Sequence, residues 1–276
     1  MSGSVVAAID GSAGSAAAAE WAAGEAAALG AELLLVYVVA DEPEPGTHSA
    51  DADAGPLLER AAGEVAGRYP ALRVTTRLRH GDPGSELAAA GAEAEAGLLV
   101  LRAPGAEGWE HAPAGGAAFA LTARASCPVV LVPRGERQND GDEVVLGVDA
   151  RHADQSAVDL AFATARRRGA VLRAVHAWGL PPAAERLPYT VTEEDRGAWE
   201  DQELQRLSDT LRGWREKYPA VHVHDDLRLL PPDEALPAAS ARAERIVIGR
   251  GGPAMSPTAR AVLRRARCPV VVVPTT

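Results

Sequence analysis

VVAAID at residues 5–10 is a short apolar run that ends in the carboxylate of Asp10, and VVLGVD at residues 144–149 repeats it, ending in Asp149. Other segments recur in the same order in the two halves. Residues 34–38 match 172–177, residues 69–74 match 218–223, residues 98–101 match 245–248, and a Cys-Pro-Val-Val run begins at Cys127 and again at Cys268. Similar segments in a fixed order indicate an internal duplication. We therefore predict two domains, residues 1–134 (the first copy) and 142–276 (the second copy).

The segment between the copies is polar and has no apolar periodicity. It reads RGERQNDGD over residues 134–142, and its Asn-Asp-Gly run favours a turn. We therefore interpret it as a linker.

Within each copy, short β-branched runs alternate with longer alanine-rich segments. Runs of four to seven apolar residues without alternation are typical of strands buried on both faces of a parallel sheet. Residues 12–29 carry an apolar helical face, and Gly30 stands where that helix is expected to stop, as Gly169 does in the second copy. Strand–helix alternation implies right-handed crossovers. The sequence predicts an α/β fold of two tandem doubly wound units, each a five-stranded parallel sheet with helices on both faces.

Composition excludes several classes of partner. The net charge of −10 opposes nucleic-acid binding, and no apolar run reaches the roughly 18 residues of a membrane span. The first residues, MSGS, show no basic region of a signal peptide, and two cysteines do not form a disulfide framework. We expect a cytoplasmic protein with no nucleic-acid or membrane partner. The acidic, Pro-bearing residues 41–56 are expected to form a surface loop.

A ligand site is expected where the strand order of the sheet reverses, at the carboxyl ends of the strands. In the first copy this edge receives Asp10, Val38 and the loop from Arg102 to Gly116. A carboxylate accepts hydrogen bonds from a ribose hydroxyl or an adenine amino group. Glycines let the backbone approach a phosphate, and a helix N-terminus offers N–H donors to it. Together these elements suit a nucleotide.

Each copy resembles the universal stress protein family, whose ATP-binding members have Gly-x-x-Gly, nine residues, and then Gly-Ser or Gly-Thr. The matching residues are Asp10, Gly105 and Gly115, together with Gly-Asp-Pro at 81–83 and Cys-Pro-Val at 127–129, and nine residues separate Gly105 from Gly115. The resemblance spans nearly the whole chain. It implies that the first copy binds ATP, with or without Mg²⁺, through Asp10, Val38, Arg102, Gly105, Gly115 and Gly116.

Two departures affect this site. Arg102 replaces the family's first loop glycine, and Gly116 replaces a hydroxyl residue. The missing hydroxyl removes a phosphate donor, worth about 0.5–1.5 kcal/mol. Arg102 could obstruct the phosphates or donate to them, and the sequence leaves both alternatives open.

The second copy keeps Gly249-Arg-Gly-Gly252, but only residues 253–255 separate it from Ser256-Pro257. Pro257 has no N–H to donate. We therefore expect this copy to bind ATP poorly or not at all.

The leading functional hypothesis is a non-catalytic, ATP-sensing stress protein. The alternatives are a nucleotide-independent interaction scaffold and a slow ATPase, for which no base or metal ligand can be named. His222 and His224 on one strand face suggest at most half a metal site, and both cysteines are expected to be packed. The resemblance also implies that the strands containing Val129 and Val271 pair across the copies, and that a homodimer and further protein partners are open to the chain.

Overall fold

A computed structural model describes residues 3–40, 50–104, 117–133, 141–180, 191–252 and 255–275. The chain divides into two compact units. One contains residues 1–136, 252–255 and 271–274, and the other contains residues 137–251, 256–270 and 275–276. Each unit is described by itself below.

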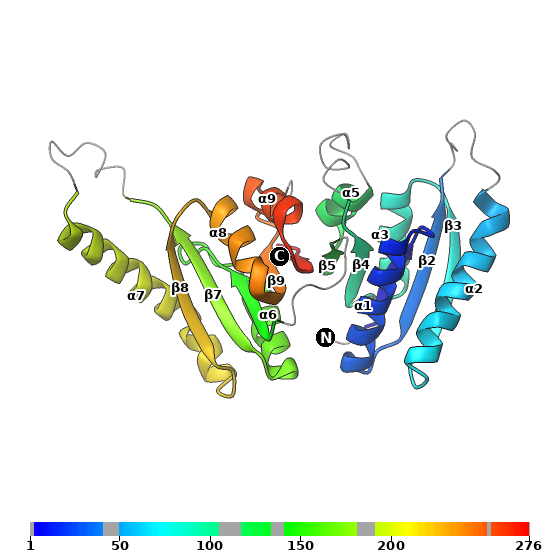
Figure 1. Cartoon of the computed structure of the whole chain (residues 1–276), viewed down its shortest axis with the longest axis horizontal. Helices are drawn as coiled ribbons and strands as arrows, with labels where there is room; N and C mark the ends of the chain where they lie inside the picture. The colour runs from blue at the N-terminus through cyan, green and yellow to red at the C-terminus, as the bar shows by residue number, and fades with distance from the viewer. Residues whose placement is uncertain are drawn as a thin grey trace. The chain divides into compact units, whose positions relative to one another are not determined.

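The first copy forms a parallel sheet in the order β3-β2-β1-β4-β5. Its strands are β1 (Val5–Ile9), β2 (Leu33–Val39), β3 (Val74–His80), β4 (Leu98–Arg102) and β5 (Val129–Val132). Its described helices are α1 (Ala13–Leu29), α2 (Ala50–Arg68), α3 (Pro83–Glu93) and α5 (Ala117–Arg124). Helices α1 and α2 contact each other, as do α3 and α5, and Figure 1 shows helices on both faces of the sheet. The predicted doubly wound unit is confirmed.

The second copy repeats this arrangement in the order β10-β9-β6-β7-β8. Its strands are β6 (Glu143–Gly147), β7 (Val171–Trp178), β8 (Val223–Leu229), β9 (Ala243–Gly249) and β10 (Val270–Val273). Its described helices are α6 (Gln155–Arg168), α7 (Glu193–Lys217), α8 (Pro232–Ala239) and α9 (Pro257–Arg265), with a 3₁₀ turn, η2 (Ser240–Arg242). Strand order reverses between β6 and β9, and between β1 and β4 in the first copy, so each copy has one switch point.

The helix boundaries follow from local chemistry. Gly30 and Gly169 end α1 and α6 in the left-handed conformation, with φ of 64° and 63°, which confirms the predicted stops. The expected loop over residues 41–56 is wrong in its last part, because α2 begins at Ala50. Leu58 and Val65 on that helix are 4% and 5% exposed, so burial of an apolar face outweighs the acidic, Pro-bearing start.

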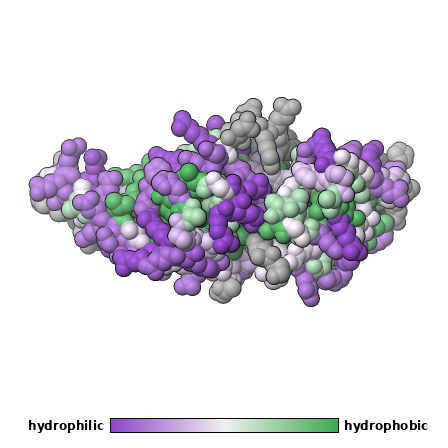
Figure 2. Space-filling model, turned by 90° about the horizontal axis from the view of Figure 1, so that it is seen from below, coloured by the Kyte–Doolittle hydropathy of each residue, from purple (hydrophilic) through white to green (hydrophobic). Residues whose placement is uncertain are grey.

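The core of each sheet is aliphatic. Val5, Leu33 and Val100 of the first copy are at most 1% exposed, as the predicted two-sided burial requires. The face drawn in Figure 2 is largely hydrophilic, with apolar residues in small groups. Within the described part of the chain, no helix is long and apolar enough to cross a membrane.

Candidate functional site

Each copy has a cavity at its switch point. The cavity of the first copy has a volume of about 320 Å³ and is lined by Asp10 after β1, Val38 on β2 and Arg102 at the end of β4. The structure thus brings together these three predicted site residues. The other predicted residues, Gly105, Gly115 and Gly116, lie outside the described residues.

An ion pair between Asp10 and Arg102 lines the cavity of the first copy. The Nε and Nη2 atoms of Arg102 lie 3.2 and 3.1 Å from Oδ2 of Asp10, and the backbone N–H of Ser12 donates to Oδ1 of Asp10 at 2.9 Å. Partial burial acts to raise the pKa of Asp10, but the hydrogen bonds from Ser12 and Ser15 and the charge of Arg102 hold it below its ordinary value. The carboxylate predicted to bind the ligand is therefore ionised and already paired.

Arg102 also covers the start of α1. A methyl group on Gly14 would lie 2.3 Å from Cδ of Arg102. Only Nη1 of the guanidinium is buried without a hydrogen-bond partner among the described residues. Arg102 could obstruct the phosphates or donate to them. Its ion pair with Asp10 favours obstruction, although its Nη1 atom remains as one unpaired donor among the described residues.

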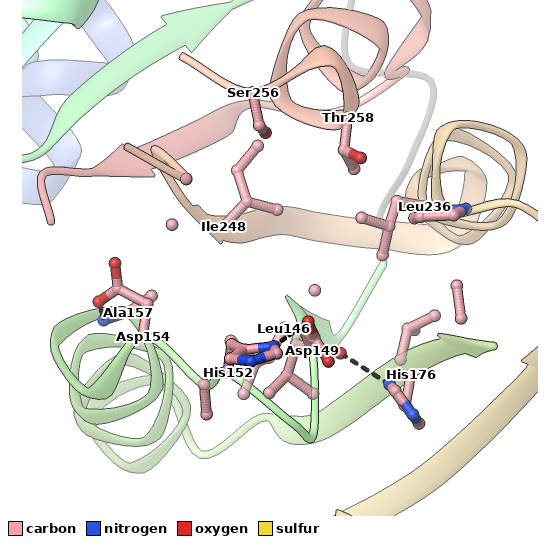
Figure 3. A pocket seen from close by; sticks show the side chains of 18 of the residues that line it. Leu146, Asp149, His152, Asp154, Ala157, His176, Leu236, Ile248, Ser256 and Thr258 are labelled. Atoms are coloured by element: carbon pink, nitrogen blue, oxygen red, sulfur yellow. Dashed lines mark hydrogen bonds and ion pairs between the residues drawn. The ribbon is translucent and has the colours of Figure 1, made fainter. Parts of the chain in front are cut away.

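The second copy has the larger cavity, about 780 Å³, at the carboxyl ends of β6, β7 and β9 and beside α8 and α9 (Figure 3). Apolar walls come from Leu229, Leu236 and Ile248, and polar groups come from Asp149, His152, Asp154, His176, Ser256 and Thr258. Sequence reasoning missed the size of this cavity. In the repeat, Gly249 stands where the first copy has Arg102, so no side chain extends into the cavity from this position.

The Asp149 carboxylate faces this cavity and remains accessible. Its Oδ1 atom accepts the backbone N–H of Arg151 at 2.9 Å, and its Oδ2 atom lies 3.3 Å from Nδ1 of His152. Burial acts to raise the pKa of Asp149, but these hydrogen bonds outweigh it and place the pKa below its ordinary value. Its side chain is 55% exposed, so it can accept hydrogen bonds from a ligand.

A buried pair of His176 and Glu203 lies beside the larger cavity, which His176 lines. His176 on β7 is 2% exposed, and its Nε2 atom lies 3.2 Å from Oε2 of Glu203 on α7, which is 5% exposed. Nδ1 of His176 lies 3.1 Å from the carbonyl oxygen of Val148. Glu203 also pairs with Arg151 and Arg206. Only one feature of the sequence pointed to this pair, a histidine inside the apolar run of β7.

In the second copy, the described loop residues Arg250 and Gly251 contact Ser256 at the start of α9. Gly251 and Gly252 have φ of 73° and 118°, and the Ser256 N–H donates to the carbonyl of Arg250 at 3.0 Å. A methyl group on Gly251 would lie 2.9 Å from Oγ of Ser256, which in turn accepts the N–H of Ala259 at 3.1 Å. The side chain and the N–H of Ser256 therefore lie against Gly251 and Arg250 at the start of α9.

Asp154 adds negative charge beside the same loop. It caps α6, where its Oδ1 atom accepts the Ala157 N–H at 3.1 Å. Its Oδ2 atom is buried without a partner among the described residues, and a methyl group on Gly249 would lie 2.8 Å from it. Figure 3 shows Asp154 across the opening from Ser256.

The other candidate residues form no second site. Among the described residues, no group of three or more His, Cys, Asp or Glu side chains could hold a metal, and this includes His222 and His224. Burial raises the pKa of Cys127 to about 11 and that of Cys268 to about 12, so both thiols stay protonated at neutral pH. Cys268 is 2% exposed and packs as predicted, whereas Cys127 is only partly buried.

Comparison with known proteins shows similarity along the whole chain. The model of the Universal stress protein family matches residues 1–133 and 142–274. A universal stress protein of Mycobacterium tuberculosis is 31% identical over 289 aligned residues, covering 97% of this chain and 96% of the relative. One from Mycolicibacterium smegmatis is 31% identical, covering 88% and 85%. The crystal structure of a universal stress protein from Archaeoglobus fulgidus has a TM-score of 0.70 at 17% identity, covering 99% and 96%, and shares the fold.

Proposed function

This chain belongs to the universal stress protein family, and we propose that it binds an adenine nucleotide or nucleoside as a sensor, without turning the ligand over. The observation that carries the proposal is the cavity of about 780 Å³ at the switch point of the second copy. Its volume lies within the range of about 300–1,000 Å³ typical of small-molecule sites. A family fold with an open cavity at this position supports a ligand-binding role.

The chemistry of the cavity suits a base and a sugar. Leu229, Leu236 and Ile248 offer apolar surface for a flat ring, and the accessible Asp149 carboxylate offers acceptors for hydroxyl or amino groups. Asp149 and Ile248 lie at the carboxyl ends of β6 and β9, Leu229 ends β8 and Leu236 lies on α8; all four line one cavity, so one ligand can contact both kinds of surface.

The polar groups beneath the cavity support a sensing role. Glu203 is paired with Arg151, Arg206 and His176, so its carboxylate is not placed to activate a water molecule. We propose that the protein responds to its ligand through binding alone.

Thermal unfolding of ligand-free protein tests the proposal. A ligand at 100 times its Kd should add about 2.7 kcal/mol to the free energy of unfolding. We expect this shift for at least one of adenosine, AMP and ATP–Mg²⁺, with released phosphate at the level of the buffer. If none of the three shifts the transition, the sensor proposal fails; phosphate release that depends on the protein would instead indicate an ATPase.

The Arg102–Asp10 ion pair favours a second role for the first copy, as a scaffold that does not bind nucleotide. Replacing Arg102 with glycine restores the family's loop residue and frees the Asp10 carboxylate. By calorimetry with ATP–Mg²⁺ and adenosine, we expect Arg102→Gly to add one binding site per chain. If the wild-type first copy already binds and Arg102→Gly weakens it, the unpaired Nη1 atom of Arg102 is a phosphate donor instead.

A further inference from the structure

We propose that the cavity of the second copy is a nucleoside site, which selects an uncharged base and sugar over phosphorylated forms of the same ligand. This inference rests on the proposed function and specifies the ligand class for one of the two copies. Three observations carry it: the partners of the N–H groups near the cavity, the positions of two carboxylates, and the ion pairs of the basic side chains.

Among the described residues at the start of α9, two backbone N–H groups are already paired and a third residue has none. At the start of α9 the Ser256 N–H donates to Arg250, the Ala259 N–H donates to Ser256 Oγ, and Pro257 has no N–H. Phosphate sites at helix N-termini depend on such N–H groups being available. A phosphate entering here would have to displace the Ser256 side chain from Gly251, which it approaches closely.

Two carboxylates face the same space. Asp154 lies against Gly249, which is the position of the family's first loop glycine, and Asp149, which follows β6, lines the same cavity. Like charges repel strongly where apolar walls exclude water. Phosphate groups directed toward Gly249 would therefore meet the Asp154 carboxylate.

The basic side chains Arg151 and His152, which line the cavity, do not offset this charge. Arg151 is held by Glu203, and His152 lies against Asp149. Both are therefore engaged with carboxylates of the protein itself.

The same groups favour an uncharged ligand that carries hydrogen-bond donors. The Asp149 carboxylate is 55% exposed, so a sugar hydroxyl can donate to it. The hydroxyl of Thr258 also lines the cavity. A nucleoside satisfies these acceptors without adding negative charge.

The test compares adenosine, AMP and ATP–Mg²⁺ by calorimetry on the full chain and on Asp154→Asn. Asparagine caps a helix about as well as aspartate, so the variant keeps the α6 cap while it loses the charge. For the wild-type cavity we expect adenosine to bind about tenfold more tightly than AMP. In Asp154→Asn we expect the affinity for AMP to rise about tenfold and that for adenosine to change less than about threefold.

The controls separate this inference from the proposed function. Asp209→Asn removes an equal charge from an exposed position on α7 and should change neither affinity. Circular dichroism checks the fold of each variant, and Asp154→Ser provides a second uncharged cap. Wild-type AMP or ATP binding as tight as adenosine, or an unchanged AMP affinity in both Asp154 variants, would overturn nucleoside selection while leaving the sensor proposal intact. Absence of binding by all three compounds would remove both.

Discussion

Replacing Glu203 with alanine is expected to lower the free energy of unfolding by about 1–3 kcal/mol, the usual cost of leaving a buried hydrogen-bonding group without its partner. Glu203 is 5% exposed and joins α7 to His176 on β7 and to Arg151 in the loop after β6. Its removal leaves the Nε2 atom of a 2%-exposed histidine without its partner. Chemical denaturation monitored by circular dichroism measures the change.

Two further variants make the test specific. Glu203→Gln keeps the volume and a hydrogen-bond acceptor for His176, so it should be less destabilising than alanine. Glu200→Ala changes an exposed glutamate of the same helix and should stay within about 0.5 kcal/mol of the wild type. If Glu203→Ala is as mild as Glu200→Ala, the buried pair does not stabilise the second copy.

The same substitution should weaken the binding of adenosine. His176 and Arg151 both line the larger cavity, and Glu203 holds both of them. A cavity that loses this support is expected to bind with lower affinity even at temperatures where the variant stays folded. We therefore expect α7 to affect ligand binding through His176 and Arg151, which its Glu203 side chain holds in place.

The fold could be predicted from the sequence because its signals are local. Apolar runs such as residues 5–9 specify buried parallel strands, and glycines such as Gly30 and Gly169 stop the helices that follow. The duplication then fixed the second sheet once the first was known. The start of α2 was missed because acidic and Pro-bearing residues precede the apolar positions that hold the helix in place.

The site was predictable only in part. Sequence order placed Asp10, Val38 and Arg102 together, because parallel strands end at one edge. It could not show that Arg102 pairs with Asp10, since a side-chain rotamer decides whether a guanidinium turns toward a ligand or a neighbour. The His176–Glu203 pair was also hidden, because its members lie 27 residues apart on a strand and a polar helix.

Replacing Ala177 with tryptophan is expected to abolish adenosine binding, with affinity reduced at least about 100-fold, the consequence of filling a preformed site. Ala177 lies on β7 and lines the larger cavity, and Val38 is its counterpart on β2 in the smaller one. Val38→Trp therefore makes the same change in the other copy and should leave adenosine affinity within about threefold of the wild type.

Comparing the adenosine affinities of Ala177→Trp and Val38→Trp shows which copy holds the ligand, and the comparison needs no assumption about the loops. Both positions lie near strand ends beside open space, so an indole can enter the cavity without crowding the aliphatic core, and thermal denaturation without ligand checks that both variants fold. Loss of binding in Val38→Trp with retention in Ala177→Trp would place the ligand in the first copy, as loop length alone predicts. Loss in Ala177→Trp alone would place the ligand in the second copy, where Gly249 stands at the position that Arg102 has in the first copy.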